Sequence, residues 1–295
     1  MLVQLLDGSM GQELIRRGAG CQGELWAADA LFNAPEAVRE IHEDYIRAGA
    51  DTICTNSYSA IPWKFEQAGV SDRLEEMVRF SGDLAVQARN NSGQDVLIAG
   101  SLPPLHGSYN PDRVLPYETM LPIYRQQVAW LADYVDLFLC ETMSTANEAL
   151  AAATAAMTTA KPVWVSWTLD DTQPGHLRSG ETITEAHRLL TDLEIDAYLL
   201  NCSMPETITS SLPELVSLGK RAGAYANGFS NVSSKWVYSG DETLPSSRCD
   251  LDPQSYSAFA AQWIADGARI IGGCCEIGPA HIAELRKLID SFPPN

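Results

Sequence analysis

One pattern in the sequence limits the fold more than any other. Short apolar runs, each ending in a polar or small residue, alternate with amphipathic segments along the whole chain. The apolar runs cover residues 2–6, 52–54, 96–99, 135–140, 163–167, 197–200, 223–226 and 269–271. Near-continuous apolarity within a run is typical of parallel strands that are buried on both faces. We therefore predict eight parallel strands.

The segments between these runs have the signals of helices. Thr145 and Thr182 are each followed three residues later by a glutamate, which is the spacing of a capping box, and Asp252 precedes Pro253 as an N-cap precedes a first-turn proline. Further amphipathic segments span residues 35–48, 72–90, 117–134, 205–220 and 279–291. Strand and helix alternate without a linker, so we predict an α/β fold: a single-domain (β/α)8 TIM barrel over residues 1–295.

Three segments that follow predicted strands are longer than a barrel turn requires. They span residues 8–33, 102–116 and 228–251. In a (β/α)8 barrel the segments after the strands cover the face where catalysis takes place. We expect them to form the walls of a pocket, although surface loops without a function would give the same pattern.

The charge balance excludes some classes of partner. The chain has 38 acidic and 20 basic side chains, a formal net charge of -18. Such a charge opposes binding to nucleic acid or to anionic membranes and is compatible with a cationic or zwitterionic small substrate, or merely with solubility. No apolar run approaches the roughly 18 residues of a membrane span and no leader is evident, so we expect a cytoplasmic protein.

Polar residues and thiols close almost every predicted strand. They are Asp7, Thr55, Asn56, Ser101, Glu141, Ser166, Thr168, Asn201, Cys202, Asn227, Cys274 and Cys275. Burying such groups is costly unless they are paired or coordinated, so their concentration at one rim of a barrel indicates a site rather than packing.

The cysteines give the sharpest signal. Cys202 ends the sixth predicted strand, and Cys274 and Cys275 follow the eighth, so the strand ends can approach across the barrel mouth. Gly272 and Gly273 would let the backbone leave the extended conformation so that both sulfurs of the pair converge. Three thiolates suit zinc and leave a fourth tetrahedral position for a substrate. A Cys-Cys pair is also often only structural.

The chain has seven cysteines in all, and without a secretory signal they are expected to be reduced thiols. Cys54 and Cys140 lie within apolar strands and are predicted to pack in the core. Cys21 and Cys249 lie in long loops, and we assign them no role.

Two carboxylates give the predicted site a class of substrate. Asp7 and Glu141 close the first and fourth strands. Each alone could be a capping or turn residue, but together at one rim they could hold the ammonium group of an amino acid. Backbone amides of the turn at Gly8, Ser9 and Met10, where a helix is expected to start, could bind its carboxylate.

At these residues the chain resembles the homocysteine S-methyltransferase family, almost from end to end. The shared motifs are Asp7-Gly8-Ser9-Met10-Gly11, Pro35-Glu36-Ala37-Val38, Arg47-Ala48-Gly49-Ala50-Asp51, Thr55-Asn56-Ser57-Tyr58, Glu141-Thr142, Asn201-Cys202-Ser203 and Gly272-Gly273-Cys274-Cys275. The resemblance implies a zinc-containing (β/α)8 barrel with Cys202, Cys274 and Cys275 as the metal ligands. It also implies that Asp7 and Glu141 hold the homocysteine amine.

The activity implied by the resemblance is methyl transfer from a small donor to the thiolate of L-homocysteine, which gives methionine. Trp26 and Tyr58 match donor-side aromatic residues of the family, and Asn201 belongs to one of its substrate-site motifs. S-methylmethionine is the first expectation for the donor, then S-adenosylmethionine and then betaine. Methylfolate is the least expected, because no folate or cobalamin module is evident.

Two segments depart from the pattern of the family. Residues 276–279 replace the usual segment after the cysteine pair, and residues 103–105 replace a glycine-rich turn after the third strand. Both are expected to reshape the donor side, and neither contains a predicted metal or amine contact.

Other classes of function remain open at this point. A non-catalytic zinc-binding barrel or a thiol redox sensor would also use Cys274 and Cys275, and would have a closed metal site or none. A metallohydrolase is disfavoured because the five histidines form no recognisable ligand cluster.

Overall fold

Eight strands form the sheet that positions the rest of the molecule. The computed structural model describes residues 3–20, 23–230, 232 and 245–292. The strands are β1 (Gln4–Leu5), β2 (Thr52–Cys54), β3 (Leu97–Leu102), β4 (Leu137–Met143), β5 (Val163–Trp167), β6 (Ala197–Asn201), β7 (Arg221–Tyr225) and β8 (Ile270–Ile271). Their order is β1-β8-β7-β6-β5-β4-β3-β2, and a parallel bridge between Leu6 and Thr52 closes the ring. The predicted (β/α)8 barrel is confirmed.

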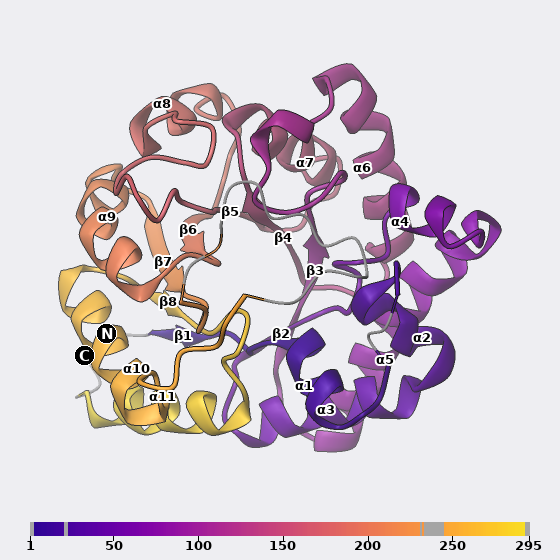
Figure 1. Ribbon diagram of the computed structural model, residues 1–295, viewed down its shortest axis with the longest axis horizontal. Helices are drawn as coiled ribbons and strands as arrows, with labels where there is room; N and C mark the ends of the chain where they lie inside the picture. The colour runs from indigo at the N-terminus through magenta and orange to yellow at the C-terminus, as the bar shows by residue number, and fades with distance from the viewer. Residues whose placement is uncertain (1–2, 21–22, 231, 233–244, 293–295) are drawn as a thin grey trace.

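Helices surround the strands (Figure 1). The main ones are α3 (Pro35–Arg47), α5 (Leu74–Ser92), α6 (Tyr117–Leu131), α7 (Ala146–Ala156), α8 (Ile183–Leu189), α9 (Pro205–Ser217), α10 (Pro253–Asp266) and α11 (Pro279–Ser291). The capping box at Thr182 and the N-cap at Asp252 form as predicted. At Thr145 only half of the predicted box forms, because the Glu148 carboxylate accepts from the Ser144 backbone N–H.

Apolar side chains cover both faces of the sheet. The larger core cluster packs the outer face of the strands against the helices and includes Ile53, Ile98, Phe138, Val165 and Leu200. A smaller cluster consists of Leu6, Ala99, Leu137, Leu139, Trp164, Ala197, Leu199, Tyr225 and Ile270, and it fills the barrel interior. Burial on both faces is the physical reason for the near-continuous apolarity of the strands.

The segments after the strands build the upper face of the barrel. The segment after β1 folds into α1 (Met10–Arg16), the short helix η1 (Trp26–Ala28) and α2 (Asp29–Asn33), and the segment after β2 contains α4 (Pro62–Gln67). The segments after β3 and β8 include the short helix η3 (Pro111–Arg113) and the cysteine pair, and residues 233–244 lie outside the described part. Among the described helices, none combines the length and apolarity that a bilayer span needs.

Candidate active site

A cavity of about 180 Å³ lies at the carboxyl ends of the strands. Ten of the eleven residues predicted to bind substrate or metal line it: Asp7, Gly8, Ser9, Met10, Trp26, Tyr58, Glu141, Cys202, Cys274 and Cys275. They come from five of the eight strand ends or the segments that follow them. The barrel therefore brings together residues that are far apart in the sequence.

The three predicted cysteine ligands converge at one side of this cavity. Their sulfur atoms all lie within 4.8 Å of one another. The sulfurs of Cys202 and Cys275 are 3.8 Å apart. Two sulfurs bound to one tetrahedral zinc at about 2.3 Å would be separated by about 3.8 Å. The three donor atoms and the Cys202–Cys275 spacing therefore fit a zinc ion.

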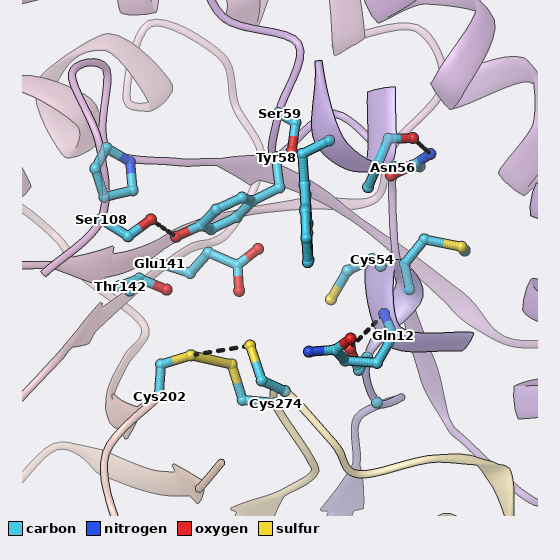
Figure 2. A pocket seen from close by; sticks show the side chains of 18 of the residues that line it. Gln12, Cys54, Asn56, Tyr58, Ser59, Ser108, Glu141, Thr142, Cys202 and Cys274 are labelled. Carbon is cyan, nitrogen blue, oxygen red and sulfur yellow. Dashed lines mark hydrogen bonds between the residues drawn. A yellow bond between two sulfur atoms is a disulfide. The ribbon is translucent and has the colours of Figure 1, made fainter. Parts of the chain in front are cut away.

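Cys202 and Cys274 are joined by a disulfide (Figure 2). The prediction that all the cysteines are reduced thiols is wrong for this pair. The barrel brings their Cα atoms to 5.6 Å, although they are 72 residues apart in the sequence. That Cα separation is within the usual range of disulfides. Because zinc binds thiolates, the disulfide and the three-cysteine metal site exclude each other.

Gly272 and Gly273, before the cysteine pair, are needed because neighbouring side chains leave no room for a Cβ atom at either position. A Cβ on Gly272 would lie 2.5 Å from the Cβ of Leu6, and one on Gly273 would lie 2.2 Å from the Cγ2 of Ile277. Neither glycine adopts the left-handed conformation. The chain leaves the strand at these glycines, because β8 ends at Ile271, and a left-handed residue follows at Glu276, with φ of 69°.

Backbone strain is concentrated around the cavity. Among the described residues, the non-glycine residues with positive φ are Trp26, Tyr109, Thr142, Cys202 and Glu276. The first four line the cavity, and Glu276 directly follows Cys275. Each such residue costs on the order of 1–3 kcal/mol, and strain of this kind clusters at functional sites.

Asp7 and Glu141 are carboxylates held by neutral hydrogen-bond donors. Asp7 is 5% exposed and its Oδ2 accepts from the backbone N–H of Cys54 at 2.7 Å. The Glu141 carboxylate accepts from the hydroxyls of Ser101 and Tyr225. Burial raises the pKa of each carboxyl to about 7. A bound ammonium group would supply the positive charge that favours their ionised forms.

Gln12, on α1, is a site residue that the sequence analysis missed. It lines the cavity and is 3% exposed, and its amide Nε2 has no hydrogen-bond partner among the described residues. Figure 2 shows its side chain on the same side of the cavity as Cys54 and Cys274. A buried donor without a partner is costly unless a ligand satisfies it. The expected helix start near Gly8 could have drawn attention to this position.

Cys54 and Cys140 both pack against core clusters, as predicted, but Cys54 also lines the cavity. Cys54 is partly buried and lines the cavity, because it is the last residue of β2 and faces the barrel interior. Cys140 is buried in the main core, as predicted. Cys249 is exposed, and Cys21 lies outside the described residues.

Asn201 does not line the cavity. Its Oδ1 accepts from the backbone N–H of Thr142 at 3.0 Å and from the hydroxyl of Ser166 at 2.7 Å. Its Nδ2 donates to the hydroxyl of Thr142 at 2.8 Å. Asn201 therefore lies outside the cavity and holds Thr142, a cavity residue in a strained conformation, through hydrogen bonds.

Aromatic side chains form the wall of the cavity across from the cysteines. The hydroxyls of Tyr58 and Ser108 are hydrogen-bonded at 2.6 Å (Figure 2). The Trp26 indole lies so close to Gly11 that a Cβ there would be 2.7 Å from its Nε1. Trp63 and Lys64, which the sequence analysis did not single out, line the same cavity. Burial lowers the pKa of Lys64 to about 8.

Comparisons with known proteins agree with this geometry. The family model described as homocysteine S-methyltransferase matches residues 4–289. A homocysteine S-methyltransferase of Escherichia coli (strain K12) is 33% identical and aligns over 96% of this chain and 94% of its own length. A selenocysteine methyltransferase of Astragalus bisulcatus is 28% identical, over 97% and 92% of the two chains.

Solved structures give the same result. The metallated form of the homocysteine methyltransferase MmuM from Escherichia coli superimposes with a TM-score of 0.81, at 32% identity over 97% of this chain and 96% of that one. The oxidized form of the same protein also gives a TM-score of 0.81, over 97% and 95% of the two chains at 31% identity.

Proposed function

The chain belongs to the homocysteine S-methyltransferase family and is an enzyme of that activity, and on this premise we propose a zinc-dependent reaction with S-methylmethionine as the donor. In this proposal Cys202, Cys274 and Cys275 hold the zinc ion. The observation that carries it is the convergence of their sulfurs within 4.8 Å at the wall of the cavity. A tetrahedral zinc held by these three cysteines would keep one position for the substrate thiolate. The non-catalytic barrel considered from the sequence is set aside because the family is enzymatic.

Zinc supplies one chemical effect when it is bound. It lowers the pKa of the homocysteine thiol by binding the thiolate, which is the nucleophilic form of a group that otherwise titrates near 8.5. The metal site forms only after the Cys202–Cys274 disulfide is reduced.

The protein's own residues orient the amino-acid end of homocysteine. Asp7 and Glu141 bind the ammonium group, whose charge compensates their buried carboxylates. The turn at Gly8, Ser9 and Met10 binds the carboxylate through groups other than the Ser9 N–H, which donates to the Ile277 carbonyl at 2.9 Å, and the unpartnered amide of Gln12 supports it. Asn201 acts through Thr142 as a positioning residue.

The donor occupies the aromatic side of the cavity. Trp26 and Tyr58 present ring faces that attract a sulfonium cation. The homocysteine thiolate attacks the methyl carbon in line with the departing thioether, the sulfonium carbon–sulfur bond breaks, and two neutral thioethers result. Positioning supplies much of the rate enhancement in such a transfer. S-adenosylmethionine and betaine are the second and third candidates.

The donor assay must distinguish the two product molecules. With S-methylmethionine, donor and acceptor both become methionine, so homocysteine carrying an isotopic label in its backbone is supplied to the reduced, zinc-loaded protein. We expect labelled methionine with S-methylmethionine at a higher rate than with S-adenosylmethionine or betaine. No labelled methionine from any donor would contradict the proposed reaction, and full activity of Cys274→Ala would contradict the metal mechanism.

A further inference from the structure

A tyrosine from a distant segment contacts the predicted metal ligands. Tyr109 lies between β3 and α6, is 4% exposed, and places its hydroxyl 2.9 Å from the sulfur of Cys202. In the zinc-bound protein Cys202 is a thiolate without a proton, so the tyrosine hydroxyl must be the donor of this hydrogen bond. Tyr109 also has φ of 67°, a conformation that costs free energy in a residue with a side chain.

The ring of Tyr109 is held by a buried arginine. The guanidinium carbon of Arg178 lies 5.1 Å from the centre of the Tyr109 ring. Its Nη2 pairs with Asp171 at 3.2 Å, and its Nη1 donates to the backbone carbonyl of Val232 at 2.6 Å. The Asp171 carboxylate in turn accepts from the backbone N–H of Met204 at 2.8 Å. These contacts fix the guanidinium from the segments after β5, β6 and β7.

Stability alone does not account for this arrangement. The side chains of Arg178 and Asp171 are 2% and 3% exposed, and a buried ion pair of this kind is often no more stabilising than apolar residues of similar size. The group nevertheless connects four separate segments around the Tyr109 hydroxyl, which contacts the sulfurs of both Cys202 and Cys275. All these contacts have one result in common: they fix the position of the Tyr109 hydroxyl.

We propose that Arg178 positions Tyr109 so that its hydroxyl donates a hydrogen bond to the metal-bound Cys202 thiolate, and that this contact raises the affinity of the protein for zinc. The inference rests on the proposed three-cysteine metal site. Three thiolates on a divalent ion leave a net negative charge, which grows when the substrate thiolate binds. A hydrogen bond donated to one ligand sulfur offsets part of this negative charge. Hydrogen bonds to metal ligands typically change the metal affinity by about 10–100-fold.

The test compares two buried tyrosines in the reduced, full-length protein. Zinc affinity is measured by competition with a chromophoric chelator, and cobalt(II) is used as a second probe through its thiolate charge-transfer absorption. Tyr109→Phe is expected to weaken zinc binding by about 10–100-fold and to shift the cobalt band. The control is Tyr124→Phe, which also removes a buried hydroxyl, here one bonded to the Pro103 carbonyl at 2.8 Å. It is expected to leave both readings unchanged.

Arg178→Lys tests the positioning role. Lysine keeps the positive charge opposite Asp171 but cannot bind Asp171 and the Val232 carbonyl with two separate nitrogens as the guanidinium does. The substitution is expected to weaken zinc binding in the wild-type background and to have little further effect in the Tyr109→Phe background. An equal loss in both backgrounds would overturn the role of Arg178. Unchanged zinc affinity and an unchanged cobalt band in Tyr109→Phe would overturn the inference. If wild-type protein gives no thiolate-to-cobalt band, the metal site itself is refuted.

Discussion

Asp7 is placed where its charge destabilises the fold, and in the proposed function the substrate's ammonium group binds that charge. Burial raises its pKa from 3.8 to about 7. As the pH rises from about 4 to about 7, the unfolded chain loses this proton before the folded protein does, so the free energy of unfolding falls over that window. Above pH 7 the penalty is complete, and binding of an ammonium group is what offsets it.

Asp7→Asn is therefore expected to stabilise the protein at pH 8 by about 1–3 kcal/mol, while the KM for homocysteine rises by at least about 10-fold. The asparagine oxygen can still accept from the Cys54 N–H, so the local hydrogen bond is kept. Urea unfolding at pH 8 and at pH 4.5 measures the effect. A gain in stability of the same size at both pH values would show that ionisation is not its cause.

The two carboxylates also predict how activity depends on pH. Asp7 and Glu141 both have pKa values raised to about 7 in the free protein, and in the proposed function the ammonium group binds their ionised forms. We expect kcat/KM for homocysteine to rise with pH through about 7, since this ratio reports the free enzyme. Glu141→Gln is expected to make the rise shallower. A wild-type profile that is flat between pH 6 and 8 would contradict this assignment.

Gln12 allows a test of substrate binding that does not disturb the metal. If its amide binds the homocysteine carboxylate, Gln12→Ala raises the KM by about 10-fold or more, the cost of one hydrogen bond to a charged group, and leaves the zinc affinity unchanged. Gln127→Ala is the matched control, because Gln127 is also a buried glutamine but donates to the Ala60 carbonyl. It is expected to lower stability without changing the KM. A wild-type KM in the Gln12→Ala enzyme would show that Gln12 does not bind the substrate.

At the scale of secondary structure, the segment after β8 is packed without spare room. A methyl group at residue 273 would collide with Ile277, at 2.2 Å from its Cγ2. Gly273→Ala is therefore expected to displace Cys274 and Cys275 and to abolish the cobalt–thiolate band, although the barrel still folds. Circular dichroism checks the fold, and an unaltered band would show that this backbone can shift without loss of the site.

The elements were predictable to different degrees. The bounds of β2 and β5 follow from their apolar runs, because both faces of these strands are buried. The short helix α4 was not predicted, since six residues give too little periodicity to recognise. Tyr109 and Arg178 were missed for another reason: both lie in segments between a strand and a helix, where no periodicity indicates which way a side chain points.

The candidate site was also only partly predictable from the sequence. Strand ends indicated Cys202, Asp7 and Glu141 because the topology fixes where such ends meet. The Cys202–Cys274 disulfide and the partnerless amide of Gln12 depend on distances of a few ångströms, which spacing along the chain does not determine.

At the scale of the whole molecule, the proposed metal site would couple metal binding to folding. Zinc held by Cys202 and the 274–275 pair would connect the ends of β6 and β8, which β7 separates. An ion that binds only the folded chain stabilises it by about 4 kcal/mol at a thousand times its dissociation constant. We expect zinc to raise the unfolding temperature of the reduced protein but not that of Cys274→Ala, as calorimetry can measure. An equal rise in both would indicate binding elsewhere.

The pairing of β1 with β8 also fixes when the site is completed during synthesis. Asp7 leaves the ribosome before β2 to β8, whereas Cys274 and Cys275 leave it only after all eight strands. The growing chain therefore holds an incomplete rim until β8 is inserted beside β1. With the proposed three-cysteine site, the full ligand set is present only once β8 and the residues after it have been made, and a nascent chain that stalls before β8 has Cys202 but neither Cys274 nor Cys275.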